Sequence, residues 1–185
     1  KEKFIKLYKQ KIQREGADKL LEWLCKTDFF VAPASTRFHG SEEGGLLKHS
    51  LNVYEMLSSS EFLQDINPES IAITSLLHDL CKVNFYKTEM RNYKNEETGK
   101  WEKVPYYTID DQMPYGHGEK SVYIVSGFIK LTRDESMAIN WHMGGFDDRV
   151  KGGSYALGGA FEKYPLALEL HIADMRATYQ LEKSV

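Results

Sequence analysis

The sequence predicts an all-α fold that carries one small β-hairpin insert. Apolar residues recur at helical spacing over most of the 185 residues, and this periodicity breaks only over about residues 85–108. The length suits one domain with a single sizeable core. We therefore expect N-terminal helices and a loop over residues 1–43, followed by a helical core over residues 44–182.

Two short helices and a loop are expected at the N-terminus. Phe4, Tyr8 and Ile12 follow helical spacing, and a second helical stretch covers residues 17–24 after a glycine. Residues 32–40 are rich in small residues and turn formers, which predicts an irregular loop.

Two further helices are predicted in the first half of the core. An amphipathic stretch at residues 46–57 carries His49 in its first turn. The next helix begins at Pro68, a residue favoured at the first helical position. Its apolar residues continue far enough to bring His78 and Asp79 near its C-terminal end.

The break in helical periodicity predicts a β-hairpin. Residues 87–94 and 101–108 flank a polar stretch at residues 95–100, which indicates two strands and a longer turn. The segment is strongly aromatic, with Tyr86, Tyr93, Trp101, Tyr106 and Tyr107. Two interpretations stay open: a small cover over one side of the helical bundle, or a wall of the active-site cleft that stacks a base.

The C-terminal third predicts helices at about residues 119–130, 133–143 and 166–182. Thr132 and Glu135 have the spacing of a capping box at the start of the second of these helices. A glycine-rich loop over residues 144–159 is expected to connect the second helix to the third.

Composition limits the class of protein. With 42% hydrophobic and 28% charged residues, the chain is typical of a globular protein rather than a disordered one. The net charge of −3 argues against a general nucleic-acid scaffold, and no extended nucleic-acid-binding surface is evident. No apolar run approaches the roughly 18 residues of a membrane span, so we expect a cytoplasmic protein with no membrane contact. Cys25 and Cys81 are expected to be reduced, buried thiols. The first residue is Lys1 rather than Met, so the natural chain is not assumed to begin there.

Imidazole and carboxylate residues occur in the order H…HD…H…H…D, at His49, His78, Asp79, His117, His142 and Asp174. These donors together suit manganese, iron, nickel or zinc, and a carboxylate can bridge two ions. An adjacent His and Asp at the end of a buried helix would be costly to bury without a partner. The pattern therefore predicts a site for two metal ions.

This ordered set resembles the ligand set of the HD-domain superfamily of metal-dependent phosphohydrolases, in its binuclear branch. The resemblance covers about residues 44–180 and implies an HD-domain-like helical bundle. It implies two divalent transition metal ions (Mn, Fe, Ni or Zn), with Mg as a further option. One ion would be held by His49, His78, Asp79 and Asp174, and the other by Asp79, His117 and His142.

The resemblance also implies the reaction, which is hydrolysis of a phosphate ester by a metal-bound hydroxide. Asp79 would act as the bridging ligand, and Lys82 matches the basic residue that the family places near the scissile phosphate. The family usually has glycine before this lysine, whereas Cys81 stands here, which bears on where Lys82 points. The expected substrate is a small phosphorylated molecule, a nucleotide or a short oligonucleotide.

Other residues are candidates for weaker roles. Arg37 and His39, in the loop before the first ligand helix, and Lys120, just after His117, are candidate contacts for a substrate phosphate. His171, three residues before Asp174 on the same helical face, is either a partner for a metal ligand or a packing residue. Asp147 and Asp148 are expected to be solvated loop acids.

Three alternatives remain beside the binuclear phosphohydrolase. His142 ends a helix, where the dipole alone favours His, so a mononuclear site without His117 and His142 stays open. The same ligand order occurs in di-iron oxygenases of the myo-inositol oxygenase type. The third alternative is a non-catalytic module that senses a nucleotide.

Overall fold

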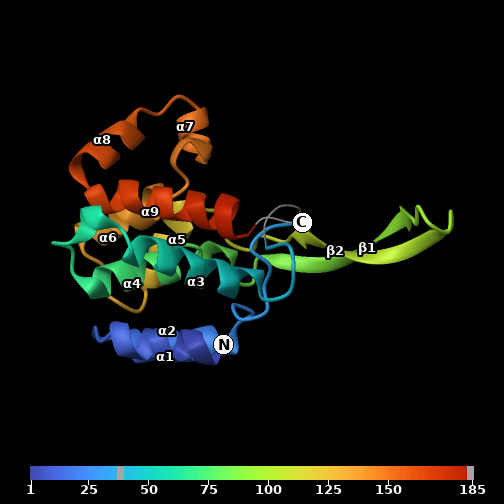
Figure 1. The fold of residues 1–185 in the computed structure, drawn as a ribbon, viewed down its shortest axis with the longest axis horizontal. Coiled ribbons are helices and arrows are strands. Elements are labelled where there is room, and N and C mark those ends of the chain that lie inside the picture. The colour runs from blue at the N-terminus through green and yellow to red at the C-terminus, as the bar shows by residue number, and fades with distance from the viewer. Residues whose placement is uncertain (37–39, 183–185) are drawn as a thin grey trace.

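The computed structural model describes residues 1–36 and 40–182. Nine α-helices and one two-stranded antiparallel sheet form within these residues (Figure 1). The expected all-α fold with a β-hairpin is confirmed at this level. No helix in the described part of the chain is long and apolar enough to cross a lipid bilayer.

The N-terminal helices α1 (Glu2–Lys11) and α2 (Ala17–Lys26) lie side by side along one side of the bundle (Figure 1). Phe4, Tyr8 and Leu20 are fully buried in a core shared with the central helices, and the Tyr8 hydroxyl donates to the Ala17 carbonyl at 2.9 Å. Both helices match the predicted ones. Cys25, in α2, is exposed, so the expectation of a buried thiol is wrong there and right for Cys81.

The central pair consists of α3 (Gly45–Ser58) and α4 (Pro68–Leu77). Asn67 caps α4, because its side chain accepts a hydrogen bond from the Glu69 N–H. Helix α4 is buried on nearly all sides and ends at Leu77, one residue earlier than His78, which is its C-cap. Asp79 therefore follows the helix rather than lying in it, and the short 3-10 turn η2 (Leu80–Lys82) comes next.

The second half of the bundle contains α5 (His117–Ser126), α6 (Arg133–Trp141) and α9 (Pro165–Arg176). The predicted capping box at Thr132 and Glu135 is present at the start of α6. A second apolar core joins α3, α6 and α9. Helix α9 continues as the π-helical turn η4 (Ala177–Leu181), a rare geometry that is frequent at functional sites.

The segment predicted as a glycine-rich loop is only partly irregular. It contains the 3-10 turn η3 (Gly144–Phe146), the short helix α7 (Asp148–Lys151) and the start of α8 (Ala156–Lys163). Asp147 starts α7 by accepting from the Arg149 N–H, and it also pairs with the Arg149 guanidinium at 2.7 Å. The prediction that Asp147 is solvated is therefore wrong, whereas Asp148 is exposed as expected.

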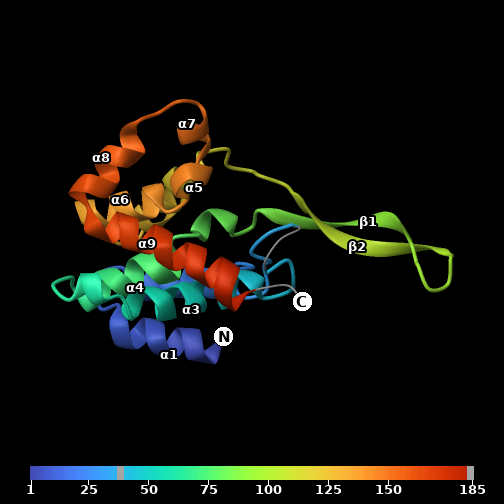
Figure 2. The ribbon, with the colours of Figure 1, turned by 45° about the horizontal axis from the view of Figure 1, so that its top comes forward.

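The hairpin matches its predicted bounds and differs in where it lies. Strands β1 (Tyr86–Lys94) and β2 (Trp101–Ile109) pair in register from Tyr86 opposite Ile109 to Lys94 opposite Trp101. The two strands project from the bundle as an arm (Figures 1 and 2). The arm therefore does not cover the side of the bundle, because nearly all of its side chains are exposed or only partly buried.

Candidate metal centre

The structure brings all six predicted ligand residues together. They come from α3 (His49), the end of α4 (His78 and Asp79), the first position of α5 (His117), the C-cap of α6 (His142) and α9 (Asp174). Their donor atoms form three overlapping groups, and within each group the atoms lie within 4.8 Å of one another. The groups are His49–His78–Asp79, His78–His142–Asp174 and Asp79–His117–His142. This is a buried cluster that can hold metal ions.

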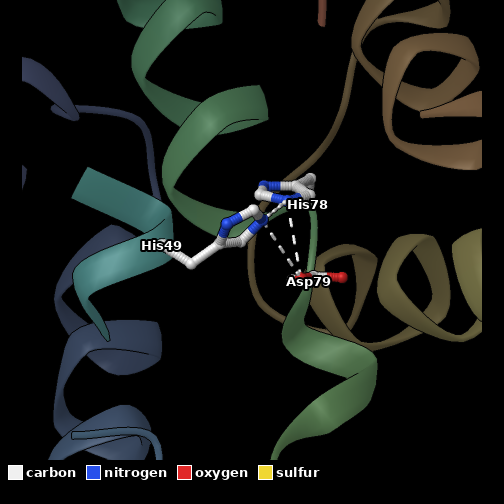
Figure 3. A group of neighbouring side chains, drawn as sticks. All are labelled: His49, His78 and Asp79. Atoms are coloured by element: carbon white, nitrogen blue, oxygen red, sulfur yellow. Dashed lines mark hydrogen bonds and ion pairs between the residues drawn. The ribbon is translucent and has the colours of Figure 1, made fainter. Parts of the chain in front are cut away.

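The first group lies where α3 meets the end of α4 (Figure 3). The Nε2 atoms of His49 and His78 are 3.3 Å apart, and each is 3.6 Å from Oδ2 of Asp79. Asp174 adds an Oδ1 atom at 3.2 Å from His49 Nε2. All of these nitrogen and oxygen donors point to a common centre.

The far side of each buried imidazole ring is anchored to the protein. Nδ1 of His78 donates to the Ser75 carbonyl at 2.8 Å, and Nδ1 of His142 donates to the Ile139 carbonyl at 2.7 Å. Both carbonyls belong to the last turn of a helix, where they lack a partner within the helix. Because the proton is on Nδ1, the Nε2 lone pair faces the centre, as in rings that bind metal.

Glu182 anchors the third ring. Its carboxylate oxygens lie 3.1 and 3.2 Å from His49 Nδ1, and Oε1 also accepts from Asn52 at 2.8 Å. No pattern in the sequence indicates this residue, which follows the π-helical turn η4 and is 133 positions from His49. A carboxylate on the outer nitrogen of a metal-binding His is a common arrangement.

The third group, Asp79–His117–His142, surrounds the other oxygen of Asp79. Oδ1 lies 2.8 Å from His117 Nε2 and 3.5 Å from His142 Nε2. Among the described residues, no group forms a hydrogen bond with the buried His142 Nε2. A buried ring nitrogen with an inward lone pair and no donor is expensive to keep, and a metal ion satisfies it.

Two glycines permit the close approach of these segments. A Cβ at position 118 would collide with the backbone of Asn140, so Gly118 lets the start of α5 reach the end of α6. Gly144 has a φ of +53° and lies against the His171 ring, which donates from Nδ1 to the His142 carbonyl at 2.7 Å. His171 therefore helps to hold the end of α6.

The charges of the cluster favour cations. Burial raises the pKa of Asp79, but Lys82, His78 and the hydrogen bond from His117 hold it well below its usual range. Burial likewise raises the pKa of Asp174, and His49 outweighs this, so the Asp174 pKa also lies below its usual range. Burial lowers the pKa of His78 to about 3, which keeps that ring neutral. Burial also lowers the pKa of His49, yet Asp174 and Glu182 raise it to about 10. Two ionised carboxylates thus face imidazole nitrogens in a buried space.

A cavity of about 850 Å³ opens beside the cluster. Its polar wall is formed by His49, Asp79, Lys82, His117, Asp174 and Glu182. Tyr86 and Ile109, at the base of the arm, line another part of the wall together with Phe146 and Tyr179. The hairpin therefore contributes its base to the cavity wall.

The candidate substrate contacts have different positions. Lys120 is 5% exposed, pairs with Asp111 at 2.5 Å and lies over the Phe85 ring, and it is not among the residues that line this cavity. Its contact with a substrate phosphate stays a prediction that this geometry does not favour. Arg37 and His39 lie outside the described residues.

No protein-family model matches the chain, and no match was found among the curated proteins or the solved structures.

Proposed function

We propose that the protein is a metal-dependent phosphohydrolase with a binuclear centre, of the kind found in HD-domain proteins. The observation that carries the proposal is the convergence of four imidazoles and two carboxylates on one centre, with His142 Nε2 buried and without a hydrogen-bond partner among the described residues. Nitrogen and oxygen donors in this number suit two ions of manganese, iron, nickel or zinc.

The ligands divide between two ions in a natural way. His49 and His78 face Oδ2 of Asp79, Asp174 faces His49, and His117 and His142 face Oδ1, while His142 also lies in one group with His78 and Asp174. Asp79 would then bridge the two ions. When bound, such ions would lower the pKa of a water molecule toward neutrality and offset the charge of a phosphate group.

Lys82 supplies the chain's own positive charge at the cavity wall. Its Nζ lies 2.6 Å from Asp79 Oδ2, and the attraction of Asp79 outweighs burial and raises the Lys82 pKa, so the side chain remains a cation. The Cys81 N–H donates to the Ser121 hydroxyl at 3.0 Å, which fixes the turn that presents Lys82. Cys81 in place of glycine is therefore compatible with a lysine that contacts the substrate phosphate and stabilises its developing charge.

The cavity supports a nucleotide-sized substrate. Its volume of about 850 Å³ is within the range of small-molecule sites, and its lining combines polar groups with aromatic rings. The metal ligands and Lys82 would hold the phosphate group, and Tyr86 and Phe146 offer ring surfaces for a base. A phosphate ester of a nucleotide or of a nucleic-acid end fits this combination.

The test is hydrolysis of p-nitrophenyl phosphate, bis(p-nitrophenyl) phosphate and a nucleotide panel with Mn²⁺, Ni²⁺ or Mg²⁺. We expect metal-dependent release of product that disappears in Asp79→Ala and persists in Glu135→Gln, which changes a buried carboxylate at the start of α6 that is not part of the cluster. A protein that binds metal and hydrolyses none of these esters would contradict the proposed function. Iron-dependent consumption of dioxygen in that protein would indicate an oxygenase instead.

A further inference from the structure

The arm, residues 86–109, has two chemically different faces. In an antiparallel pair, residues directly opposite each other point to the same side, and successive residues alternate between sides. The register therefore assigns one side of the arm, which we call the apolar face, to Tyr86, Thr88, Met90, Asn92, Lys94, Trp101, Lys103, Pro105, Tyr107 and Ile109.

On the opposite face, charged side chains contact one another or an aromatic ring. Glu89 pairs with Lys87 at 3.1 Å and accepts from the Tyr106 hydroxyl at 3.2 Å. Arg91 lies over the Tyr106 ring, with 5.3 Å to its centroid. The other glutamate of the strands, Glu102, also points to this side. Both acidic residues of the two strands are thus on the opposite face.

The apolar face carries cations and no acid. Within the described residues, the side chains of Lys94 and Lys103 make no ion pair or hydrogen bond. Trp101, which stands opposite Lys94, is 71% exposed, and Met90 is 57% exposed. Aromatic and apolar side chains next to unpaired lysines are complementary to a ligand that has both flat bases and negative charges.

The apolar face leads into the cavity. Tyr86 and Ile109, the innermost pair of this face, also line the cavity that contains the metal ligands and Lys82. From Ile109 to Trp101 the strand extends over about 26 Å, taking roughly 3.3 Å per residue. A ligand that contacts both ends of the face is therefore extended and longer than a single nucleotide.

We propose that the apolar face binds single-stranded nucleic acid and guides its end into the cavity. Bases would stack on Trp101 and Tyr107 while Lys94 and Lys103 contact backbone phosphates. This inference rests on the proposed function and narrows its substrate class from nucleotides in general to the ends of single strands. It adds a nucleic-acid surface that the overall charge of the chain does not indicate.

At its β2 edge, the backbone of the arm disfavours a second chain that adds a strand. Asn95 and Lys100 are joined by a backbone hydrogen bond of 2.9 Å, and bonded and non-bonded pairs alternate from there. Met90 and Pro105 are then a non-bonded pair, whose backbone groups face outward. Because proline has no N–H, the outer edge of β2 lacks a donor at its centre.

The test compares matched variants of the two faces. The first combines Trp101→Ala, Lys94→Gln and Lys103→Gln on the apolar face. The second combines Tyr93→Ala and Arg91→Gln on the opposite face with Lys100→Gln in the connection between the strands, and therefore removes the same charge and one aromatic ring. Fluorescence anisotropy measures binding of labelled oligothymidylate and oligouridylate of about 12 nucleotides. The protein is used both as purified and after metal depletion, so that binding is measured without turnover.

We expect the apolar-face variant to bind both oligonucleotides at least about tenfold more weakly, because stacking and phosphate contacts are lost. The opposite-face variant should change this affinity by less than about twofold, as for ordinary surface substitutions. Thymidine monophosphate should bind both variants equally, since neither changes the cavity.

Equal effects of the two variants, or wild-type affinity in both, would overturn the inference. It would also be overturned if the wild type were a dimer in light scattering and the apolar-face variant a monomer, because the face would then cover a second copy. Failure of the proposed function gives a different result from failure of this inference. Oligonucleotide binding that needs the apolar face, without hydrolysis, keeps this inference and rejects the phosphohydrolase, whereas hydrolysis of small esters without such binding does the reverse.

Discussion

Two buried polar clusters hold this helical bundle together, and they differ in how completely the protein satisfies them. One is the candidate metal centre around Asp79, which we call the metal centre below. The other, the Glu135 cluster, contains Arg14, Glu69, Ser70, Thr132 and Glu135. Glu135 is fully buried and accepts four hydrogen bonds: two from Arg14 at 2.6 and 2.9 Å, one from Ser70 at 2.6 Å and one from the Thr132 N–H at 2.7 Å.

The Glu135 cluster is complete without a ligand. Its carboxylate has a guanidinium fork on one side and a helix cap on the other, so every lone pair is used. In the metal centre, two carboxylates and four imidazoles have few N–H donors to share as hydrogen bonds. His142 Nε2 has no hydrogen-bond partner among the described residues. Burial of charge is common to both clusters. Incomplete hydrogen bonding distinguishes a candidate binding site from a cluster that only supports the fold.

The largest effect on stability is expected in the complete cluster. Arg14→Met leaves the Glu135 carboxylate buried without its cation and should lower the free energy of unfolding by about 3–5 kcal/mol. Urea unfolding of wild type and variant measures this difference. The metal content of the folded variant should stay at the wild-type value. A loss of metal with unchanged stability would show that the roles of the two clusters are misassigned.

Replacing Lys82, the cation beside Asp79, should lower the catalytic rate strongly and the stability only weakly. Lys82→Met should lower kcat by about 10² to 10³-fold, the usual effect of removing one group that stabilises charge in the transition state. Its effect on the unfolding free energy should be smaller than that of Arg14→Met, because bound metal ions would still compensate the charge of Asp79. Steady-state kinetics at saturating metal provide the measurement. Wild-type kcat in this variant would exclude Lys82 from the reaction.

Replacing His117 tests whether the metal centre has two separate metal-binding halves. Its side chain is 30% exposed, the most accessible of the four imidazoles, and its Nε2 lies beside Oδ1 of Asp79 and the Cys81 sulfur. His117→Ala should therefore lose one metal equivalent per chain and retain the other. Elemental analysis of protein after removal of free metal tests this. An unchanged count would reduce the centre to a mononuclear site.

The smallest predicted effect is on pH dependence. Burial raises the Glu135 pKa, but the bonds from Arg14, Ser70 and Thr132 outweigh this and lower it below the ordinary value of 4.5. The ionised carboxylate therefore stabilises the fold above about pH 4.5, and this contribution is lost as the pH falls through the lowered folded-state pKa. Glu135→Gln should unfold with a weaker dependence on pH in this acidic window. Parallel curves for the two proteins would contradict the assignment.

The sequence predicted the parts of this molecule that depend on local pattern. Helix starts at Pro68 and Thr132 were predictable because capping uses neighbouring residues, and the hairpin because alternation and turn residues are local. The six candidate ligands were selected by residue type and order, and the structure brings them together.

The remaining features depend on tertiary contacts. Glu182 reaches His49 only because a π-helical turn extends α9, and no spacing rule predicts that pairing. Helices α7 and α8 are short and lie in a glycine-rich segment, and Asp147 is buried by its pairing with Arg149, so composition suggested a solvated loop. The outward direction of the arm was equally hidden, because an amphipathic hairpin has the same pattern whether it packs or projects.

The central claim is that the cluster around Asp79 binds two metal ions. Calorimetric titration of metal-depleted protein with Mn²⁺ or Zn²⁺ tests it most directly, with Asp79→Ala and Glu135→Gln titrated in parallel. We predict two equivalents per chain in wild type and in Glu135→Gln, and neither high-affinity equivalent in Asp79→Ala, because Asp79 contributes an oxygen to each half of the cluster. The absence of saturable binding in wild type, or the same two equivalents in Asp79→Ala, would contradict the account.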